Sequence, residues 1–221
     1  MDRIINLYAI SDLHLNPGDE FPMLNLADDD TLVINGDLLN ILPLGFKAWD
    51  TQLGFYTLSS IAAHTPSDSI VIAGNHEGRL AWVHQLFYTF RKFTIARSYE
   101  VGPYYFEHGH KRMPDWWFLR HIADDITEWA TSNPLFRSCW FEFCKRRGWM
   151  PGSYPPNPKA EEIIGFYWAN CFRHSIKSGK IWVVGHSHIK AELLPPGVKG
   201  GVIDLGKAEV RKLDVDTLCD V

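Results

Sequence analysis

The sequence predicts an α/β protein, and three observations support this fold class. Short apolar segments rich in Ile, Val and Tyr recur along the chain, as expected of buried strands. Longer segments with helical character separate them. Several apolar segments stop abruptly at Gly, Asp, Asn or His, so polar residues gather at the carboxyl ends of the predicted strands. Open α/β sheets form their crevice at that edge, so we expect the polar residues to converge there.

The predicted strands follow one another along the chain, and a polar cluster comes directly after each of the first five. These five are Ile4 to Ile10, Thr31 to Ile34, Ser69 to Ala73, Tyr104 to Phe106 and Ile181 to Val184. Two closing strands are expected over residues 201–206 and 208–215. Runs of this length and composition are typical of strands that are buried on both faces.

Helices are expected between these strands, namely Leu44 to His64, Arg79 to Phe93 and three segments between residues 115 and 178. Residues 111–180 differ from the rest of the chain in composition, because they hold six of the nine tryptophans. We interpret them as a helical insertion within one domain that spans residues 1–221. Its helix over Lys159 to Lys177 is apolar nearly all round, which predicts deep packing or a surface for a partner.

Composition bounds the class of protein. The 221 residues are 46% hydrophobic and 22% charged, and the net charge of -4 gives no overall attraction to nucleic acid or anionic membranes. The four cysteines show no C-x-x-C spacing, as in a reducing cytoplasm. No secretory signal and no membrane-spanning stretch is recognised, so we expect a cytoplasmic protein that is at most peripheral to a membrane.

Seven side chains at the predicted strand ends are candidate metal ligands: Asp12, His14, Asp37, Asn75, His108, His186 and His188. Asp12 and His14 are two residues apart, so in an extended backbone they leave on one face and can share an ion. His186 and His188 have the same spacing. Asp37 can bridge two ions through its two oxygens, and Gly36 before it allows a close approach of backbone and ion.

The chemistry of these ligands predicts the ions and the reaction. Mixed nitrogen and oxygen donors without thiolate suit first-row divalent ions rather than calcium. We expect two ions, with manganese as first choice and iron, zinc, nickel or cobalt as alternatives. Two such ions about 3.5 to 4 Å apart can clamp a phosphoryl group and lower the pKa of a bridging water, which yields a hydroxide for in-line attack. The predicted function is therefore hydrolysis of phosphate esters.

Five motifs in a fixed order resemble those of the calcineurin-like metallophosphoesterase superfamily, which are D-x-H, G-D-x-x-[DN], G-N-H-[DE], a lone His and G-H-x-H. In this chain they are Asp12-Leu13-His14, Gly36-Asp37, Gly74-Asn75-His76-Glu77, His108 and Gly185-His186-Ser187-His188. The resemblance implies the family fold, a two-sheet β-sandwich flanked by helices. That fold fits the strand count better than a single doubly wound sheet does.

The resemblance also implies how the residues divide their roles. The first metal would be held by Asp12, His14, Asp37 and His188, and the second by Asp37, Asn75, His108 and His186. His76 matches the histidine that stabilises the transition state or protonates the leaving oxygen. Many family phosphatases have Asp at the position of Asn40, where it orients that histidine. An amide can hold the tautomer of His76 but cannot stabilise an imidazolium by charge.

A narrower resemblance exists to the UDP-2,3-diacylglucosamine pyrophosphatases, carried by Ser11-Asp12-Leu13-His14-Leu15 and by a helical insertion before the last motif. The chain departs from them at His76 and His110, where they usually have Arg and Asp. One alternative function is therefore a membrane-peripheral pyrophosphatase of a nucleotide-linked lipid. Another is a metal-binding scaffold whose catalysis has decayed.

Four residues after the site motifs are candidates for substrate contacts: Arg79, His110, Lys111 and Arg112. The alternative for the three cations is an ordinary solvated charge. Residues 111–180 allow three interpretations, namely a packed cap, a lipid groove or a platform for single-stranded nucleic acid. The sequence leaves open the oligomeric state and whether the substrate is a monoester, a diester or a pyrophosphate.

Overall fold

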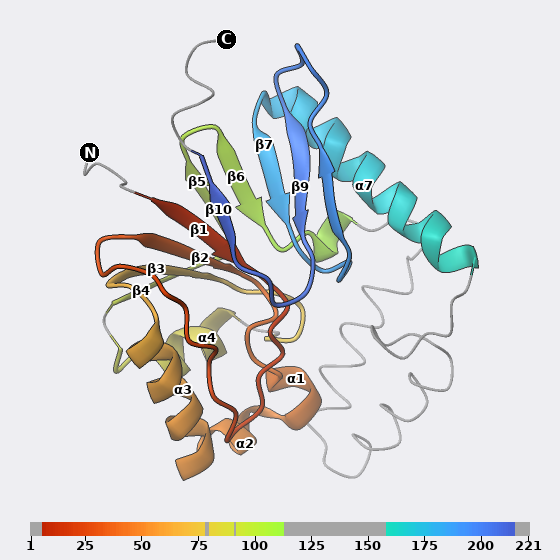
Figure 1. Cartoon of the computed structure of the whole chain (residues 1–221). Coiled ribbons are helices and arrows are strands. Elements are labelled where there is room, and N and C mark those ends of the chain that lie inside the picture. Colours follow the sequence, from red (N-terminus) through yellow and green to blue (C-terminus); the bar gives the residue numbers. More distant parts are fainter. Residues whose placement is uncertain (1–5, 78–79, 91, 113–157, 215–221) are drawn as a thin grey trace.

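The computed structural model describes residues 6–77, 80–90, 92–112 and 158–214. Two five-stranded sheets pack face to face, and helices cover the outer side of each (Figure 1). The predicted α/β fold class and the two-sheet sandwich are therefore confirmed. Most of the predicted insertion falls on residues 113–157, which lie outside the described part of the chain, so the single domain with an insertion stays a prediction.

The first sheet has the strand order β10-β1-β2-β3-β4. Its strands are β1 Leu7–Ile10, β2 Thr31–Asn35, β3 Asp68–Ile72, β4 Phe93–Ala96 and β10 Arg211–Leu213. Strands β1, β2, β3 and β4 run parallel to one another, whereas β10 pairs antiparallel with β1. The segments that follow β1, β2 and β3 therefore leave the sheet at the same edge.

The second sheet has the order β5-β6-β7-β9-β8. Its strands are β5 Ser98–Val101, β6 Tyr104–Glu107, β7 Ile181–Val184, β8 Lys190–Leu193 and β9 Gly201–Leu205. The three central strands run parallel and the two edge strands antiparallel to them. The single 3₁₀ turn that follows β6, η1, spans His110–Arg112.

The strands are apolar on both faces because each sheet is covered on both sides. In β1, Leu7 and Ala9 face the second sheet, whereas Ile10 packs beneath the helices of the first. In β7, Val183 faces the first sheet, whereas Val184 packs against the outer helix. A two-residue alternation between two apolar environments explains why these strands appear in the sequence as continuous apolar runs.

Among the described residues, four helices cover the first sheet: α1 Ile41–Leu44, α2 Phe46–Trp49, α3 Gln52–His64 and α4 Leu80–Phe87. The prediction of one helix over Leu44 to His64 is wrong. The helix is interrupted at Gly45, which has a φ of 78°, and again after α2, where the Thr51 hydroxyl accepts a hydrogen bond from Gly54 N and caps α3. The helix predicted to reach Phe93 ends at Phe87, and Phe93 begins β4.

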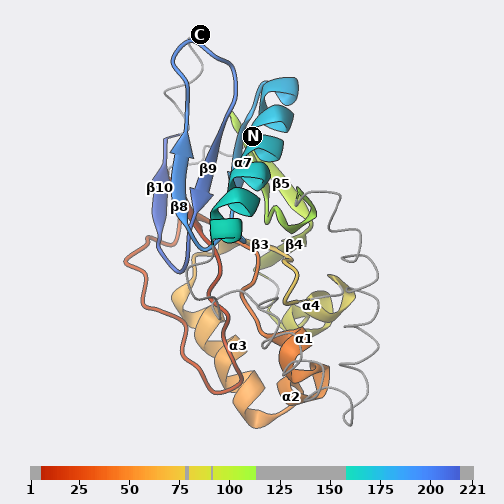
Figure 2. The ribbon, with the colours of Figure 1, turned by 90° about the vertical axis from the view of Figure 1, so that its right-hand side faces the viewer.

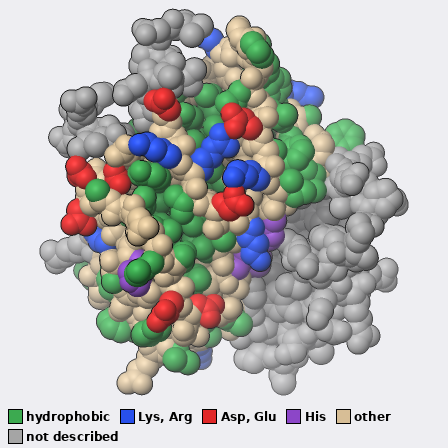
Figure 3. Space-filling view, viewed as in Figure 1, with side chains coloured by type: hydrophobic (Ala, Val, Ile, Leu, Met, Phe, Trp, Pro, Cys, Tyr) green, Lys and Arg blue, Asp and Glu red, His purple; other side chains and the backbone are tan. Residues whose placement is uncertain are grey.

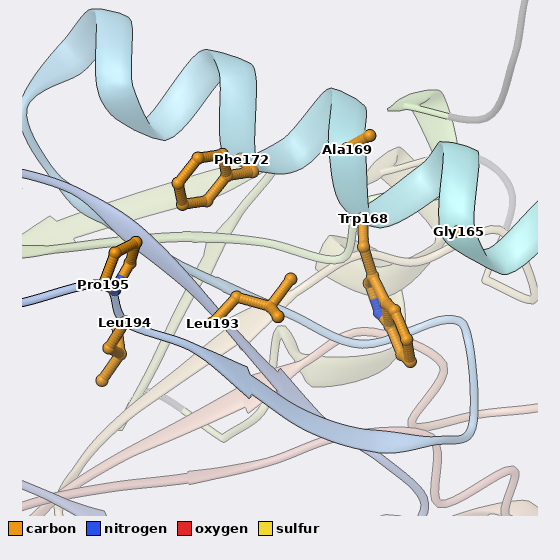
Figure 4. Close-up of a pocket in the computed structure, with 7 residues that line it drawn as sticks. All are labelled: Gly165, Trp168, Ala169, Phe172, Leu193, Leu194 and Pro195. Carbon is orange, nitrogen blue, oxygen red and sulfur yellow. The ribbon is translucent and has the colours of Figure 1, made fainter.

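The long helix α7, Pro158–Ser178, lies along the outer face of the second sheet (Figure 2). Its Tyr167 and Cys171 are buried against the sheet, as the apolar sequence predicted, while Phe166 is exposed. An apolar groove of about 550 Å³ runs between α7 and the end of β8 (Figure 4). It is lined by Gly165, Trp168, Ala169, Phe172, Leu193, Leu194 and Pro195.

Charged side chains of both signs intermix on the face seen in Figure 3. Ion pairs join Lys190 to Glu209 and Arg211 to Glu192. Exposed pairs of this kind contribute only about 0 to 1 kcal/mol each, so the stability of this face depends on the core beneath it. Among the described helices, none has the length and apolarity needed to cross a membrane.

We expect the core between the sheets to dominate stability. Phe106 is fully buried there, so Phe106→Ala should lower the free energy of unfolding by about 3 to 5 kcal/mol through lost burial and a residual cavity. Denaturant unfolding measures the change. The control is Tyr88→Ala, because Tyr88 is 84% exposed and should change stability by less than about 0.5 kcal/mol. Equal effects of the two variants would contradict the assignment of this core.

Candidate metal centre

The predicted ligands meet at one edge of the sandwich because the strands before them end there. Asp12 follows β1, Asp37 follows β2, Asn75 follows β3, His108 follows β6 and His186 follows β7. Asp12, Asp37 and His108 are buried, whereas Asn75 and His186 are partly exposed. A site with buried charges and an accessible rim results.

The first cluster joins Asp12, His14 and His188, whose ligand atoms all lie within 4.8 Å of one another. His188 Nε2 is 3.3 Å from Asp12 Oδ1 and 3.1 Å from His14 Nε2. Asp37 Oδ2 is 3.9 Å from His14 Nε2. The structure thus brings together the four residues predicted for the first ion.

The second cluster joins Asp37, His108 and His186 in the same way. His108 Nε2 lies 3.3 Å from Asp37 Oδ2 and 3.2 Å from Asn75 Oδ1. These are the four residues predicted for the second ion. Asp37 belongs to this cluster and also lies beside the first.

The Asp37 carboxylate fits a bound cation. Its Oδ2 is buried and accepts no hydrogen bond from the described residues, although two imidazoles face it. Burial alone would lower the pKa of His108, but the charge of Asp37 raises that pKa to about 10 in the protein alone. A divalent cation between the two groups would take the place of this proton. Carboxylate, amide and imidazole donors suit first-row divalent ions.

The backbone at the ligands is left-handed. Of the six non-glycine residues with positive φ in the described ranges, five are predicted ligands: Asp12 (57°), His14 (52°), Asp37 (50°), His186 (68°) and His188 (58°). Such conformations cost on the order of 1 to 3 kcal/mol each and cluster at functional sites. The expectation that Asp12 and His14 leave an extended backbone on one face is therefore wrong. Left-handed turns, rather than strand alternation, bring the two side chains together.

Two glycines of the motifs make room for the ligands. A Cβ on Gly36 would lie 2.4 Å from the His108 ring, and one on Gly74 would lie 2.2 Å from Asp37 Oδ1. Any side chain at either position would displace a ligand. This crowding gives a physical reason for the glycines before Asp37 and Asn75.

Asn35, which the sequence analysis did not single out, joins the two sheets at the site. Its Nδ2 donates to the carbonyl oxygens of Glu107 and Val183 at 3.3 and 3.0 Å. The backbone carbonyl oxygen of Asn35 accepts a hydrogen bond from His108 Nδ1 at 2.9 Å, which leaves His108 Nε2 directed at Asp37. The signal was an asparagine at the very end of an apolar strand.

Glu77 holds the two central loops. Its buried carboxylate accepts hydrogen bonds from the backbone N–H groups of Asp37, Leu39 and Gly74 at 3.1, 2.7 and 2.7 Å. Burial and the nearby charge of Asp37 raise the pKa of Glu77 to about 8, against the effect of these bonds. In the sequence, Glu77 is only the last residue of the motif Gly74-Asn75-His76-Glu77, and its role in holding the loops was not predicted.

His76 and Asn40 are adjacent, as the resemblance implied. Asn40 Oδ1 lies 2.8 Å from His76 Nδ1, and Asn40 Nδ2 donates to the carbonyl oxygen of His14 at 2.7 Å. The second bond fixes the amide so that its oxygen faces the His76 ring. His76 also lies within reach of His14 and Asp37, since their ligand atoms form a third group within 4.8 Å. Burial lowers the pKa of His76.

A further network supports the last ligand loop. Asp204 Oδ2, at the end of β9, accepts hydrogen bonds from Ser187 Oγ at 2.6 Å and from Trp168 Nε1 at 2.9 Å. Ser187 stands between His186 and His188, so β9 and α7 together position that loop. Nothing in the sequence connected Asp204 with residues so distant from it in the chain.

The predicted substrate contacts have different outcomes. His110, Lys111 and Arg112 form η1 and line a cavity next to His108. Arg79 lies outside the described residues, so its predicted role stays a prediction. The tryptophans and basic residues between 113 and 157 lie outside them as well.

Fold and site together define a class of protein that holds divalent ions at the carboxyl edge of a two-sheet sandwich. The sequence profile described as calcineurin-like phosphoesterase matches residues 5–190. The chain belongs to this family, whose members are hydrolases acting on phosphoric esters. No curated protein shows significant sequence similarity to it.

The solved structures that are similar to the chain include the following two. A single mutant of Vps29 from Entamoeba histolytica is 12% identical, with a TM-score of 0.38, over 92% of this chain and 74% of that one. The phosphopantetheinyl hydrolase PptH from Mycobacterium tuberculosis is 17% identical, with a TM-score of 0.45, over 96% of both chains. Family membership therefore depends on the sequence match rather than on either structure.

We expect Asp204 to support metal binding without contacting the metal. Asp204→Ala removes the acceptor of Ser187 and frees the loop of His186 and His188, so the affinity for Mn²⁺ should fall by roughly 10- to 100-fold. Isothermal titration calorimetry measures this change. Asp204→Asn keeps an acceptor oxygen and should retain more affinity. Unchanged affinity in both variants, with the fold intact, would contradict the positioning role.

Proposed function

We propose that this phosphoesterase uses two divalent ions, held by the seven predicted ligands and bridged by Asp37. The observation that carries the proposal is the position of Asp37 Oδ2, which lies 3.3 Å from His108 Nε2 and 3.9 Å from His14 Nε2. Asp37 belongs to the second cluster and also to a group with His14 of the first. Two ions bound here would polarise a phosphoryl group and lower the pKa of a water molecule.

His76 is proposed to act at the leaving oxygen. The oxygen of Asn40 faces Nδ1 of His76, so that nitrogen carries the proton of the neutral ring. The other ring nitrogen then carries a proton only in the imidazolium form. Burial lowers the pKa of His76, and the Asn40 amide adds no charge to oppose this effect. His76 therefore donates a proton effectively only at lower pH than a histidine paired with Asp would.

The proposed metal ion and the predicted cellular location are both inferred from the residue types in the sequence. Manganese is the proposed ion, with iron, zinc, nickel and cobalt as alternatives, because the clustered donors are nitrogen and oxygen without thiolate. A cytoplasmic location, peripheral to a membrane at most, stays a prediction from the cysteine pattern. A catalytically decayed scaffold is the weaker proposal, since strained backbone and crowded glycines are retained around the ligands.

A second candidate substrate is a nucleotide-linked lipid, cleaved at a membrane surface. The observation that favours it is the apolar groove beside α7 (Figure 4). Trp168 forms part of that groove and also donates to Asp204, which in turn holds Ser187 of the last ligand loop. Two hydrogen bonds, from Trp168 to Asp204 and from Ser187 to Asp204, would therefore connect an apolar chain in the groove with the metal centre.

The direct test is a substrate panel with Mn²⁺. We expect the protein to hydrolyse p-nitrophenyl phosphate, its bis-ester or a nucleotide sugar, and to lose this activity on chelation. Asp37→Ala should lower kcat/KM by at least roughly 100-fold, because residues that merely support ligands are already worth 10- to 100-fold. Asp68→Ala is the matched control, since Asp68 is an exposed carboxylate at the start of β3.

Each outcome of the panel is informative. Absence of turnover with every ester and ion, while metal still binds, would favour the decayed scaffold. Full activity of Asp37→Ala would remove the bridging role. Turnover of a nucleotide-linked lipid alone, and only with vesicles present, would favour the second candidate.

The pairing of His76 with Asn40 predicts a pH effect. Asn40→Asp places a negative charge next to His76, which stabilises the imidazolium and raises the pKa of His76. The protonated form then persists to higher pH, so the basic limb of the profile of kcat/KM against pH should move to higher pH. His76→Gln should abolish that limb. A limb that stays in place in Asn40→Asp would refute the role of His76 as proton donor.

A further inference from the structure

A second cavity, of about 290 Å³, lies beside the metal centre. It shares Gly74 and His108 with that centre. Arg97, Lys111 and Arg112 also line it, and we call it the basic cavity. Because His108 belongs to both sites, one small substrate can contact the metal ligands and the cations together.

Arg112 is held in place at the wall of the basic cavity. Its Nη2 donates to Glu107 Oε2 at 2.9 Å, its guanidinium lies 4.9 Å from the centre of the Trp182 ring, and its carbonyl oxygen accepts from Asn170. Its Nε is buried and donates no hydrogen bond within the described part of the chain. An arginine fixed in this way is preorganised to receive an oxyanion.

Arg97 and Lys111 leave the basic cavity positive. Both are exposed, and neither is paired with an acidic group in the ranges that the structure describes. Glu107 is the single acidic residue among the described residues that line the cavity. Its Oε2 is already engaged by Arg112 and by the hydroxyl of Tyr105. Beside the proposed phosphoryl site, two positive charges therefore lack an acidic partner among the described residues.

We propose that the basic cavity binds a second phosphoryl group, so that the preferred substrates are phosphoric anhydrides such as nucleoside diphosphates. The inference depends on the proposed function, since the scissile phosphoryl group would lie at the metal centre. Water adds to that phosphorus, the bridging P–O bond breaks, and the leaving phosphate keeps the electron pair. The protons of the water go to the products and the solvent. Arg97 and Lys111 offset the charge that the leaving phosphate gains.

The test compares adenosine 5′-diphosphate with adenosine 5′-monophosphate at fixed free Mn²⁺. We expect the wild-type enzyme to prefer the diphosphate. Arg97→Ala and Lys111→Ala should each reduce this preference, measured as the ratio of kcat/KM values, by about 10-fold, since each removes a charge-assisted contact to the second phosphate. The matched control is Lys177→Ala, which removes an exposed lysine at the end of α7 and should leave the ratio unchanged.

The outcomes separate this inference from the proposed function. Turnover of neither nucleotide nor of any other ester would overturn both. Turnover of esters together with equal losses for both nucleotides in Arg97→Ala and Lys111→Ala, or with no loss, would overturn the basic cavity alone. Because both residues are exposed, unfolding curves that match the wild type should confirm that the variants fold.

Discussion

The burial of the Asp37 carboxylate between imidazoles is the constraint on which the site depends. Burial alone would raise the pKa of Asp37, but the charges of His108 and His76 hold that pKa well below its usual range. A buried carboxylate of which one oxygen accepts no hydrogen bond from the described residues costs several kcal/mol unless a cation compensates for it. The fold tolerates this arrangement because divalent ions suit the surrounding donors, which links stability of the centre to metal binding.

The surrounding structure holds this carboxylate from several directions. Glu77 gathers the loops after β2 and β3 by accepting three backbone N–H groups, and Asn35 joins the ends of β6 and β7 to β2. Asp204 ties the loop after β7 to β9 and α7. Glu77 and Asn35 satisfy backbone groups that the strand ends would otherwise leave to water. The strained ligand turns persist because these bonds over-determine them.

The sequence predicted what periodicity and strand ends encode. Strands β1, β2, β3, β6 and β7 were predicted because they are apolar on both faces and stop at polar motifs. Strands β4, β5 and β8 were missed, since each is a four-residue strand at the edge of a sheet and contains no buried residue. The ligands were found because they follow strands directly. Asn35 and Asp204 were missed because their partners are distant in sequence, and a polar residue near a strand end does not by itself reveal which distant groups it contacts.

Two chemically different regions adjoin the same centre. The basic cavity shares His108 with the second cluster, whereas the apolar groove reaches the loop of His186 and His188 through Trp168 and Asp204. A small monoester would use neither region, and its binding energy would come from the ions alone. A substrate with a second phosphate would use fixed charge at the leaving group, where charge develops during bond cleavage. Binding energy there would increase the rate as well as the affinity, which is why the proposed cavity favours the anhydride over the monoester.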